Sequence, residues 1–160
     1  MEKLEFNIKL AIILPVYNTE KYLNKFFIEL GNQDFQDFHI YAVNDGSTDC
    51  SLNILEEWSK KQERLFILNK CNGGVSSARN LALDKIRENK IKYKYIYFCD
   101  SDDYLDHDTL SKLILAMDSA DADYGLFSVR RVYKDKVVVA KQKIHNNICL
   151  LYTSPSPRDS

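Results

Sequence analysis

The chain has 160 residues, of which 45% are hydrophobic and 28% are charged, and its formal net charge is −1. A chain of this length can form one domain with a substantial core, and the composition is typical of a globular protein in water. The near balance of charges argues against a nucleic-acid-binding protein, which usually carries a basic face.

Neither the apolar runs nor the cysteines indicate a membrane or secreted protein. The longest apolar runs, such as Leu10–Leu14, reach about five residues, which is too short to span a bilayer. Met1–Glu5 carries acidic residues where a signal peptide would be apolar. The cysteines show no CxxC spacing, so we expect neither a zinc site nor a disulfide framework. We therefore expect a cytoplasmic protein without a transmembrane segment.

The spacing of apolar residues predicts strands and helices in alternation. A continuous apolar run at Ile8–Leu14 predicts a strand buried on both faces. An apolar stripe from Tyr22 to Leu30 predicts a helix that Gly31 ends. The later elements, in chain order, are a strand at Phe38–Val43, a helix capped by Asp49, a strand at Leu65–Leu68, a helix beginning near Ser76, a strand at Tyr95–Cys99, a helix capped by Asp108, and a hairpin of Tyr124–Tyr133 and Val137–Ile144 around Lys134–Lys136.

This alternation predicts a three-layer α/β/α fold with a mainly parallel sheet. In such sheets ligands bind beyond the carboxyl ends of the strands, near the point where the strand order reverses. The polar residues that directly follow each strand are therefore the candidates for a binding site.

The segments after the first two strands suit a nucleobase. Tyr17, within Pro15–Asn18, offers a flat ring on which a base can stack, although a tyrosine packed beside its own helix explains it equally well. Asp45, within Asn44–Asp49, can accept the imide N–H of uracil or thymine, whereas an Asx turn before Gly46 is the ordinary structural explanation. Taken alone, the segment of Tyr17 does not decide between binding and structure, and the segment of Asp45 favours the structural explanation.

The segments after the third and fourth strands suit phosphates and a metal ion. Asn72–Asn80 places two glycines before a helix N-terminus, with Arg79 one turn inside, although a glycine turn with a solvated arginine is the alternative. Asp100, Asp102 and Asp103 are three carboxylates within four residues. They repel one another unless a cation such as Mg²⁺ or Mn²⁺ binds among them. This repulsion favours a metal site over a purely structural role in turns and helix caps.

Together these segments resemble the motifs of family 2 glycosyltransferases with the GT-A (Rossmann-like) fold. The resemblance covers Ile8 to about Tyr133 and implies the strand order 3-2-1-4 with a C-terminal hairpin. It rests on Ile13–Asn18, Val43–Asp49, Gly73–Asn80 and Tyr97–Asp103, which read ILPVYN, VNDGSTD, GGVSSARN and YFCDSDD.

The resemblance implies a nucleoside-diphosphate sugar donor and an inverting transfer to a glycan or lipid-linked acceptor. In such enzymes the residue matching Tyr17 lies against the base, and the residue matching Asp45 pairs with the base edge. Asp100 would face the ribose or the metal, and Asp102 would bind the metal, Mg²⁺ or Mn²⁺. The nucleotide-binding residues that the resemblance implies are Pro15, Val16, Tyr17, Asp45, Asn72, Arg79, Asp100 and Ser101.

The general base for the acceptor hydroxyl is expected beyond Ile148. We therefore expect residues 1–148 to be an incomplete GT-A domain, the donor-binding half, without transfer activity of its own. The run Cys149–Asp159 resembles a translated sequencing adapter, and a disordered tail is the alternative, so we expect residues 149–160 to be non-native. His107, just past the acidic loop, is a weaker candidate for the site.

Two alternatives stay open, namely a nucleotide-binding fragment without activity and a nucleotidyltransferase with a related sheet. A nucleotidyltransferase would normally carry a glycine-rich basic loop after its first strand, which Pro15–Asn18 lacks. A haloacid-type phosphatase would carry its DxD motif after the first strand rather than the fourth. We expect the parent protein to lie in the cytoplasm, either free or bound peripherally at the inner face of the membrane.

Overall fold

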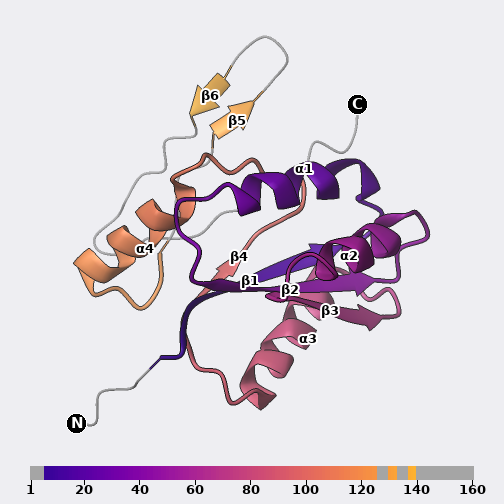
Figure 1. The fold of residues 1–160 in the computed structure, drawn as a ribbon, viewed down its shortest axis with the longest axis horizontal. Coiled ribbons are helices and arrows are strands. Elements are labelled where there is room, and N and C mark those ends of the chain that lie inside the picture. Colours follow the sequence, from indigo (N-terminus) through magenta and orange to yellow (C-terminus); the bar gives the residue numbers. More distant parts are fainter. Residues whose placement is uncertain (1–5, 126–129, 133–136, 140–160) are drawn as a thin grey trace. The chain divides into compact units, whose positions relative to one another are not determined.

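The computed structural model describes residues 6–125, 130–132 and 137–139. The chain divides into two compact units, Met1–His107 and Asp108–Ser160. Within the described ranges, every helix is too short or too polar to cross a bilayer. In chain order (Figure 1) the elements are β1 (Ile8–Val16), α1 (Glu20–Gly31), β2 (Phe38–Asp45), α2 (Ser51–Ser59), β3 (Leu65–Lys70), α3 (Val75–Glu88), β4 (Tyr93–Phe98), α4 (Thr109–Ala120), β5 (Arg130–Val132) and β6 (Val137–Val139).

Strands β1 to β4 form one parallel sheet in the order β3-β2-β1-β4, which confirms the predicted order. Ile12 of β1 pairs with Ile40 of β2 on one side and with Tyr97 of β4 on the other. Because the four strands run in the same direction, their carboxyl ends and the loops after them lie along one side of the sheet. We call this side the carboxyl edge; its strands end at Val16, Asp45, Lys70 and Phe98.

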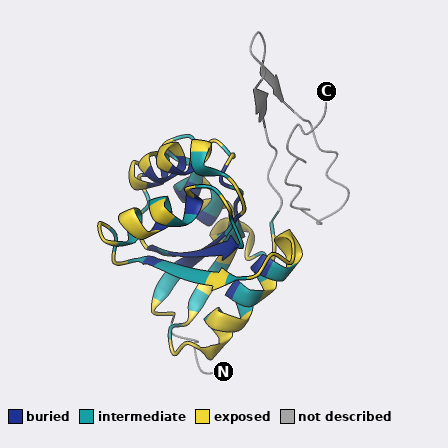
Figure 2. Cartoon of the chain, turned by 90° about the vertical axis from the view of Figure 1, so that its right-hand side faces the viewer, coloured by how far each residue is buried: buried dark blue, intermediate teal, exposed yellow. Residues whose placement is uncertain are grey.

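Helices cover both faces of this sheet, as the sequence predicts. On one face the small side chains Ala78 and Ala82 of α3 are fully buried against the strands. On the opposite face lie α1 and α2 (Figure 1), where the ring of Phe27 stacks on Trp58 with centroids 5.3 Å apart. Figure 2 shows buried strands between helices whose outer surfaces are exposed. This double cover explains the continuous apolar run of β1.

The predicted N-cap of α2 is wrong by one residue. Cys50 holds the N-cap position and α2 begins at Ser51, whereas Asp49 was the expected cap. Asp49 Oδ1 nevertheless accepts the backbone N–H of Ser51 at 2.9 Å, so it serves the helix end from one position earlier. The predicted end of α1 at Gly31 is confirmed.

In the second unit, α4 begins at Thr109 with Asp108 in the N-cap position, as predicted. The Asp108 carboxylate lies 2.6 Å from Lys112 Nζ. Strands β5 and β6 pair antiparallel, in agreement with the predicted hairpin. Its turn at Lys134–Lys136 and the expected tail at 149–160 lie outside the described residues.

Candidate functional site

The loops after β1 and β2 are tied together at the carboxyl edge. Asn18 Oδ1 accepts the N–H of Thr48 at 2.8 Å, and Ser47 Oγ accepts the N–H of Asn18 at 3.1 Å. Asn18 has φ +52°, a left-handed conformation that asparagine tolerates better than most residues. The preceding Tyr17 is 42% exposed, so its ring is accessible at this edge.

Reciprocal hydrogen bonds join the N-termini of α1 and α2. Asp49 Oδ2 accepts the N–H of Glu20 at 3.1 Å, and Glu20 Oε2 accepts the N–H of Cys50 at 2.8 Å. Desolvation opposes ionisation of Asp49, but hydrogen bonds from Ser51 and Glu20 outweigh it and lower its pKa. Both acids therefore stabilise the loops that carry the site.

Asp45, the last residue of β2, is enclosed by hydrogen-bond donors. Its Oδ1 accepts Lys70 Nζ at 2.6 Å and the N–H of Gly73 at 2.9 Å, and its Oδ2 accepts the N–H of Gly74 at 2.8 Å. Desolvation raises the pKa of Asp45, but these bonds outweigh it and hold the pKa below its ordinary value. The carboxylate, with a side chain only 4% exposed, is thus ionised and fixed in orientation.

Two glycines let the loop after β3 lie directly against Asp45. Gly46 has φ +71°, and a Cβ there would lie 2.7 Å from the backbone nitrogen of Asn72. A Cβ on Gly73 would lie 2.7 Å from Lys70 Nζ. Both distances are shorter than real Cβ contacts. At Gly46 the atom in the way is backbone, so a larger side chain would force this loop away from Asp45, whereas at Gly73 the end of the flexible Lys70 side chain would have to move.

Arg79 of α3 contacts the loop that follows β4. Its Nη2 donates to Asp100 Oδ1 at 2.9 Å, and its guanidinium carbon lies 5.7 Å from the ring centroid of Phe98. The side chains of the ion pair are 25% and 30% exposed. Nε is buried without a hydrogen-bond partner among the described residues. Since a guanidinium has five N–H donors, Arg79 keeps donors for an anionic group.

The acidic loop, Asp100–Asp103, is a turn that crowds carboxylates together. Asp103 Oδ2 accepts the N–H of Asp100 at 3.0 Å, and Asp103 returns its own N–H to the Asp100 carbonyl at 3.1 Å. Burial raises the pKa of Asp103, and the charges of Asp100 and Asp102 raise it further. Asp103 therefore forms the turn, whereas Asp102 is exposed at the edge.

The remaining predicted residues differ in how far their side chains can reach a ligand. Val16 and Ser101 are 0% and 4% exposed, so only their backbone atoms are available as the loops stand. Pro15 is half-buried and Asn72 is exposed. The structure thus joins Asp45 to Gly73 and Gly74, and Arg79 to Asp100, by direct bonds.

Of the histidines, none is joined to the predicted site by a hydrogen bond within the described part of the chain. His39 Nδ1 lies 2.7 Å from Tyr93 Oη, and burial lowers the pKa of its imidazole. His107 is exposed, and its carbonyl accepts the N–H of Asp34 at 3.0 Å. His145 lies outside the described residues.

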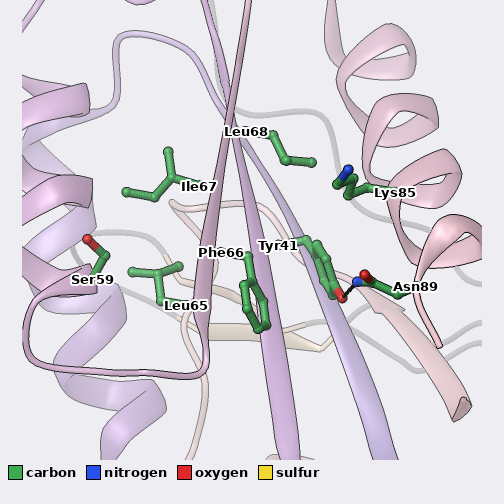
Figure 3. A pocket seen from close by; sticks show the side chains of 8 residues that line it. All are labelled: Tyr41, Ser59, Leu65, Phe66, Ile67, Leu68, Lys85 and Asn89. Atoms are coloured by element: carbon green, nitrogen blue, oxygen red, sulfur yellow. Dashed lines mark hydrogen bonds between the residues drawn. The ribbon is translucent and has the colours of Figure 1, made fainter. Parts of the chain in front are cut away.

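A pocket of about 430 Å³ lies along β3 and contains none of the predicted site residues. Its walls are mainly apolar, and two of its lining residues are joined by a hydrogen bond, which Asn89 donates to Tyr41 Oη at 2.8 Å (Figure 3). The lining residues are Tyr41, Ser59, Leu65, Phe66, Ile67, Leu68, Lys85 and Asn89.

The acidic loop fits a divalent cation that takes some of its ligands from the protein and the others from a substrate. Among the described residues, no three His, Cys, Asp or Glu side chains are grouped to hold a metal ion by themselves. Asp102 is exposed, and the ion pair with Arg79 uses Oδ1 of Asp100 and not Oδ2. Mg²⁺ and Mn²⁺ accept one or two carboxylates when phosphate oxygens complete the coordination. The donor set therefore suits these ions.

Residues 11–157 match the family Glycosyl transferase family 2. The chain belongs to this family. It is 36% identical over 118 residues to the glycosyltransferase GlyA of Streptococcus pneumoniae, covering 74% of this chain and 16% of that protein. It is 38% identical over 104 residues to an uncharacterized glycosyltransferase of Haemophilus influenzae, covering 64% of this chain and 40% of that protein. The chain therefore spans less than half the length of these relatives.

Solved structures identify the sheet as a GT-A, Rossmann-like α/β fold, as predicted. TarS 1–349 of S. aureus in complex with UDP-GlcNAc has a TM-score of 0.65 and 33% identity, and the match covers 74% of this chain and 34% of that one. The mannosyltransferase PcManGT of Pyrobaculum calidifontis, solved with GDP-Man and Mn²⁺, has a TM-score of 0.60 over 81% of this chain and 36% of its own. At 19% identity, this second likeness shows the fold alone.

Lys70 is absent from the residues predicted above, although its position indicates its role. In the register of β2 and β3, Lys70 lies directly beside Asp45. A lysine and an acid at matching ends of neighbouring parallel strands are close enough to pair, so the sequence carries a signal for this contact once the strand order is known.

Proposed function

We propose that this chain is the donor-binding part of an inverting glycosyltransferase, which transfers a sugar from a nucleoside-diphosphate sugar to a glycan or lipid-linked acceptor. The observation that carries the proposal is the segment Gly73–Arg79, which bonds to Asp45 at one end and to Asp100 at the other. One short segment thus links the two acidic sites of the carboxyl edge. The likeness to TarS, solved with UDP-GlcNAc, supports a nucleotide-sugar donor.

In this proposal each end of the segment binds a different part of the donor. Tyr17 stacks against the base, and the ionised Asp45 accepts a hydrogen bond from the base edge. Asn72 and Arg79 line the diphosphate, where the N-terminus of α3 favours negative charge. Asp100 holds the guanidinium of Arg79 in place through their 2.9 Å bond.

Asp100 and Asp102 are the residues that would hold Mg²⁺ or Mn²⁺. When bound, such an ion neutralises the charge that develops on a diphosphate leaving group. Asp102 is the exposed acid of the loop, so it can bind a cation without first giving up a partner within the turn.

We place the general base for the acceptor hydroxyl after Ile148. The neighbouring acids of the carboxyl edge are engaged in the fold, with Asp45, Asp49 and Asp103 each accepting backbone N–H groups. A positioned base contributes about 10²–10⁴-fold to such reactions. We therefore expect this chain to bind donor without transferring sugar. Metal-dependent turnover by this chain in a transfer assay with a panel of nucleotide sugars would contradict this assignment.

We further propose that the parent protein acts in the cytoplasm or peripherally at the inner face of the membrane. Cys50 and Cys71 are free and exposed, which suits a reducing compartment.

Two arginines of α3 provide a matched test of the donor site. Arg79→Met should weaken binding of nucleoside diphosphates by roughly tenfold to a hundredfold, the value of a hydrogen bond to a charged group. Arg87→Met removes an arginine that is 74% exposed and paired with Asp84, and it should leave binding unchanged. Titration calorimetry in Mn²⁺-containing buffer measures both variants. Equal affinity of the wild type and Arg79→Met would rule out Arg79 as a diphosphate ligand.

A further inference from the structure

Lys70 forms an ion pair with Asp45 at the carboxyl edge of the sheet. Its side chain is 19% exposed, against 4% for Asp45, so Lys70 is the more accessible residue of the pair. It donates to Asp45 Oδ1 and to the carbonyl of Cys71, each at 2.6 Å. An ammonium group carries three donors, so one N–H of Lys70 remains for a ligand.

The Asp45 carboxylate beside it can accept only a limited number of hydrogen bonds. A carboxylate offers about four acceptor positions, and Asp45 uses two on Oδ1, for Lys70 and Gly73, and one on Oδ2, for Gly74. Oδ1 is therefore saturated, and Oδ2 can accept one more hydrogen bond. The pair presents one acceptor, Asp45 Oδ2, beside one donor, Lys70 Nζ.

The loop around this pair is open to a flat ligand. Residues 71–76 are exposed, and around Gly74 there is open space where a Cβ would stand. The glycines keep side chains away from the surface next to the Lys70–Asp45 pair. A planar ring can therefore approach the loop closely.

We infer that Lys70 is a specificity-determining residue that, with Asp45, selects a pyrimidine imide, uracil or thymine, as the base of the donor; this rests on the proposed function. The imide N–H donates to Asp45 Oδ2, and a carbonyl oxygen next to it accepts from Lys70 Nζ. Because carbonyls flank the imide N–H on both sides, the ring finds this match in either orientation.

The other bases match this arrangement less well. In the same ring position, cytosine turns a bare ring nitrogen towards the carboxylate and an amino group towards the ammonium. Guanine has an amino group beside its ring N–H, and Oδ1 of Asp45, the acceptor for that amino group, is already saturated by Lys70 and Gly73. A base that leaves polar groups unpaired at a buried site loses affinity.

UDP and CDP are the sharpest probes, because they share ribose and diphosphate and differ at the base edge. Their affinity ratio therefore cancels the contributions of the phosphates and of any metal ion. We expect the 160-residue chain to bind UDP at least about tenfold more tightly than CDP or GDP in one Mn²⁺-containing buffer. Lys70→Met should weaken UDP binding about tenfold without weakening CDP binding.

Two further variants separate base reading from a structural role. Lys70→Arg keeps a cationic donor and should retain the preference for UDP. Lys85→Met removes an exposed lysine that pairs with Glu88, and it should change neither affinity. Melting temperatures of all variants establish that they are folded.

The outcomes distinguish this inference from the proposed function. If no nucleoside diphosphate binds, the proposed function fails. If diphosphates bind but the wild type does not prefer UDP, or if Lys70→Met weakens UDP and CDP equally, the inference about Lys70 fails alone. Loss of the UDP preference in Lys70→Met and its retention in Lys70→Arg support it.

Discussion

Two groups of acidic side chains lie at the carboxyl edge of the sheet, Asp45 by itself and the acidic loop, and the protein compensates their negative charge to different degrees. Asp45 is buried and accepts a lysine ammonium and two backbone N–H groups. The acidic loop, Asp100–Asp103, has three carboxylates, and with the residues that the structure describes they form one ion pair, between Asp100 and Arg79. Accordingly, the pKa of Asp45 is lowered, with its hydrogen bonds outweighing desolvation, whereas burial and neighbouring charges raise the pKa of Asp103.

Under the proposed function, this difference separates two kinds of binding site. The charge of Asp45 is compensated by the fold itself, so its geometry is set before a ligand arrives and a ligand can use it without any metal ion. The acidic loop keeps uncompensated negative charge, which a cation lowers in energy. The comparison therefore predicts different effects for substitutions in the two groups.

The largest difference should appear in stability. Asp45→Ala leaves Lys70 and two N–H groups without their acceptor, so we expect the free energy of unfolding to fall by about 3 kcal/mol. Asp102→Ala removes an exposed side chain and should change it by less than about 0.5 kcal/mol. Urea denaturation measures both. Similar losses for the two variants would show that the groups are not held differently.

The next difference should appear in the metal dependence of nucleotide binding. Asp102→Ala should abolish the part of nucleoside-diphosphate affinity that depends on Mn²⁺. Asp45→Asn should weaken binding by about 1.5–3 kcal/mol both with and without Mn²⁺, because its hydrogen bond goes to the base. Calorimetry with Mn²⁺ or with a chelator separates the two. An unchanged Mn²⁺ dependence in Asp102→Ala would refute the metal assignment.

Two glycines test how tightly the loops around Asp45 fit. Gly46 and Gly74 have φ values of +71° and +85°, so alanine is strained at both. Only at Gly46 would a Cβ also meet backbone, 2.7 Å from the nitrogen of Asn72, whereas Gly74 has nothing within 4 Å. We expect Gly46→Ala to cost about 2 kcal/mol or more and Gly74→Ala about 1 kcal/mol in stability. Equal losses of stability in the two variants would mean that the backbone at Asn72 moves away at little cost.

The sequence predicts the sheet order and the positions of these groups better than it predicts their contacts. A continuous apolar run such as Ile8–Leu14 marks a strand covered on both faces, and the polar residues after each strand mark the carboxyl edge. The cap at Asp49 was wrong by one residue, whereas the cap at Asp108 is confirmed. At the Asp49 end, Glu20 and Asp49 each accept a backbone N–H from the start of the other's helix, across the loops. Such reciprocal bonds depend on how close two helices lie in the folded chain, and local patterns in the sequence do not contain that information.

The ion pairs were missed for a related reason. The sequence predicts that Asp45 binds a base and that Arg79 binds phosphates. In the structure Asp45 is already paired with Lys70, and Arg79 is already paired with Asp100. Residues far apart in the chain form these pairs. The register of β2 and β3 places Lys70 beside Asp45, whereas Arg79 of α3 and Asp100 after β4 meet only through tertiary packing. The roles assigned to Tyr17, Asp45, Arg79 and Asp102 towards a donor stay predictions.

The smallest difference should appear in the pH dependence of stability, where the two groups have opposite signs. Asp45 has a lowered pKa, so its contribution is present above its ordinary value of 3.8 and is lost as pH falls below it. Asp103 has a raised pKa, so its protonated form is favoured in the fold, and that contribution is lost as pH rises through the raised value.

We therefore expect Asp45→Asn to be destabilised relative to wild type mainly at the upper end of a range from about pH 3 to about pH 7. In the same range Asp103→Asn, which keeps an oxygen for the N–H of Asp100, should gain stability relative to wild type as pH rises. Melting temperatures of both variants and the wild type across this range measure both differences. If Asp45→Asn and Asp103→Asn shift in the same direction, the two groups are not held in opposite ways, and the distinction between a site built by the fold and a site completed by a cation is lost.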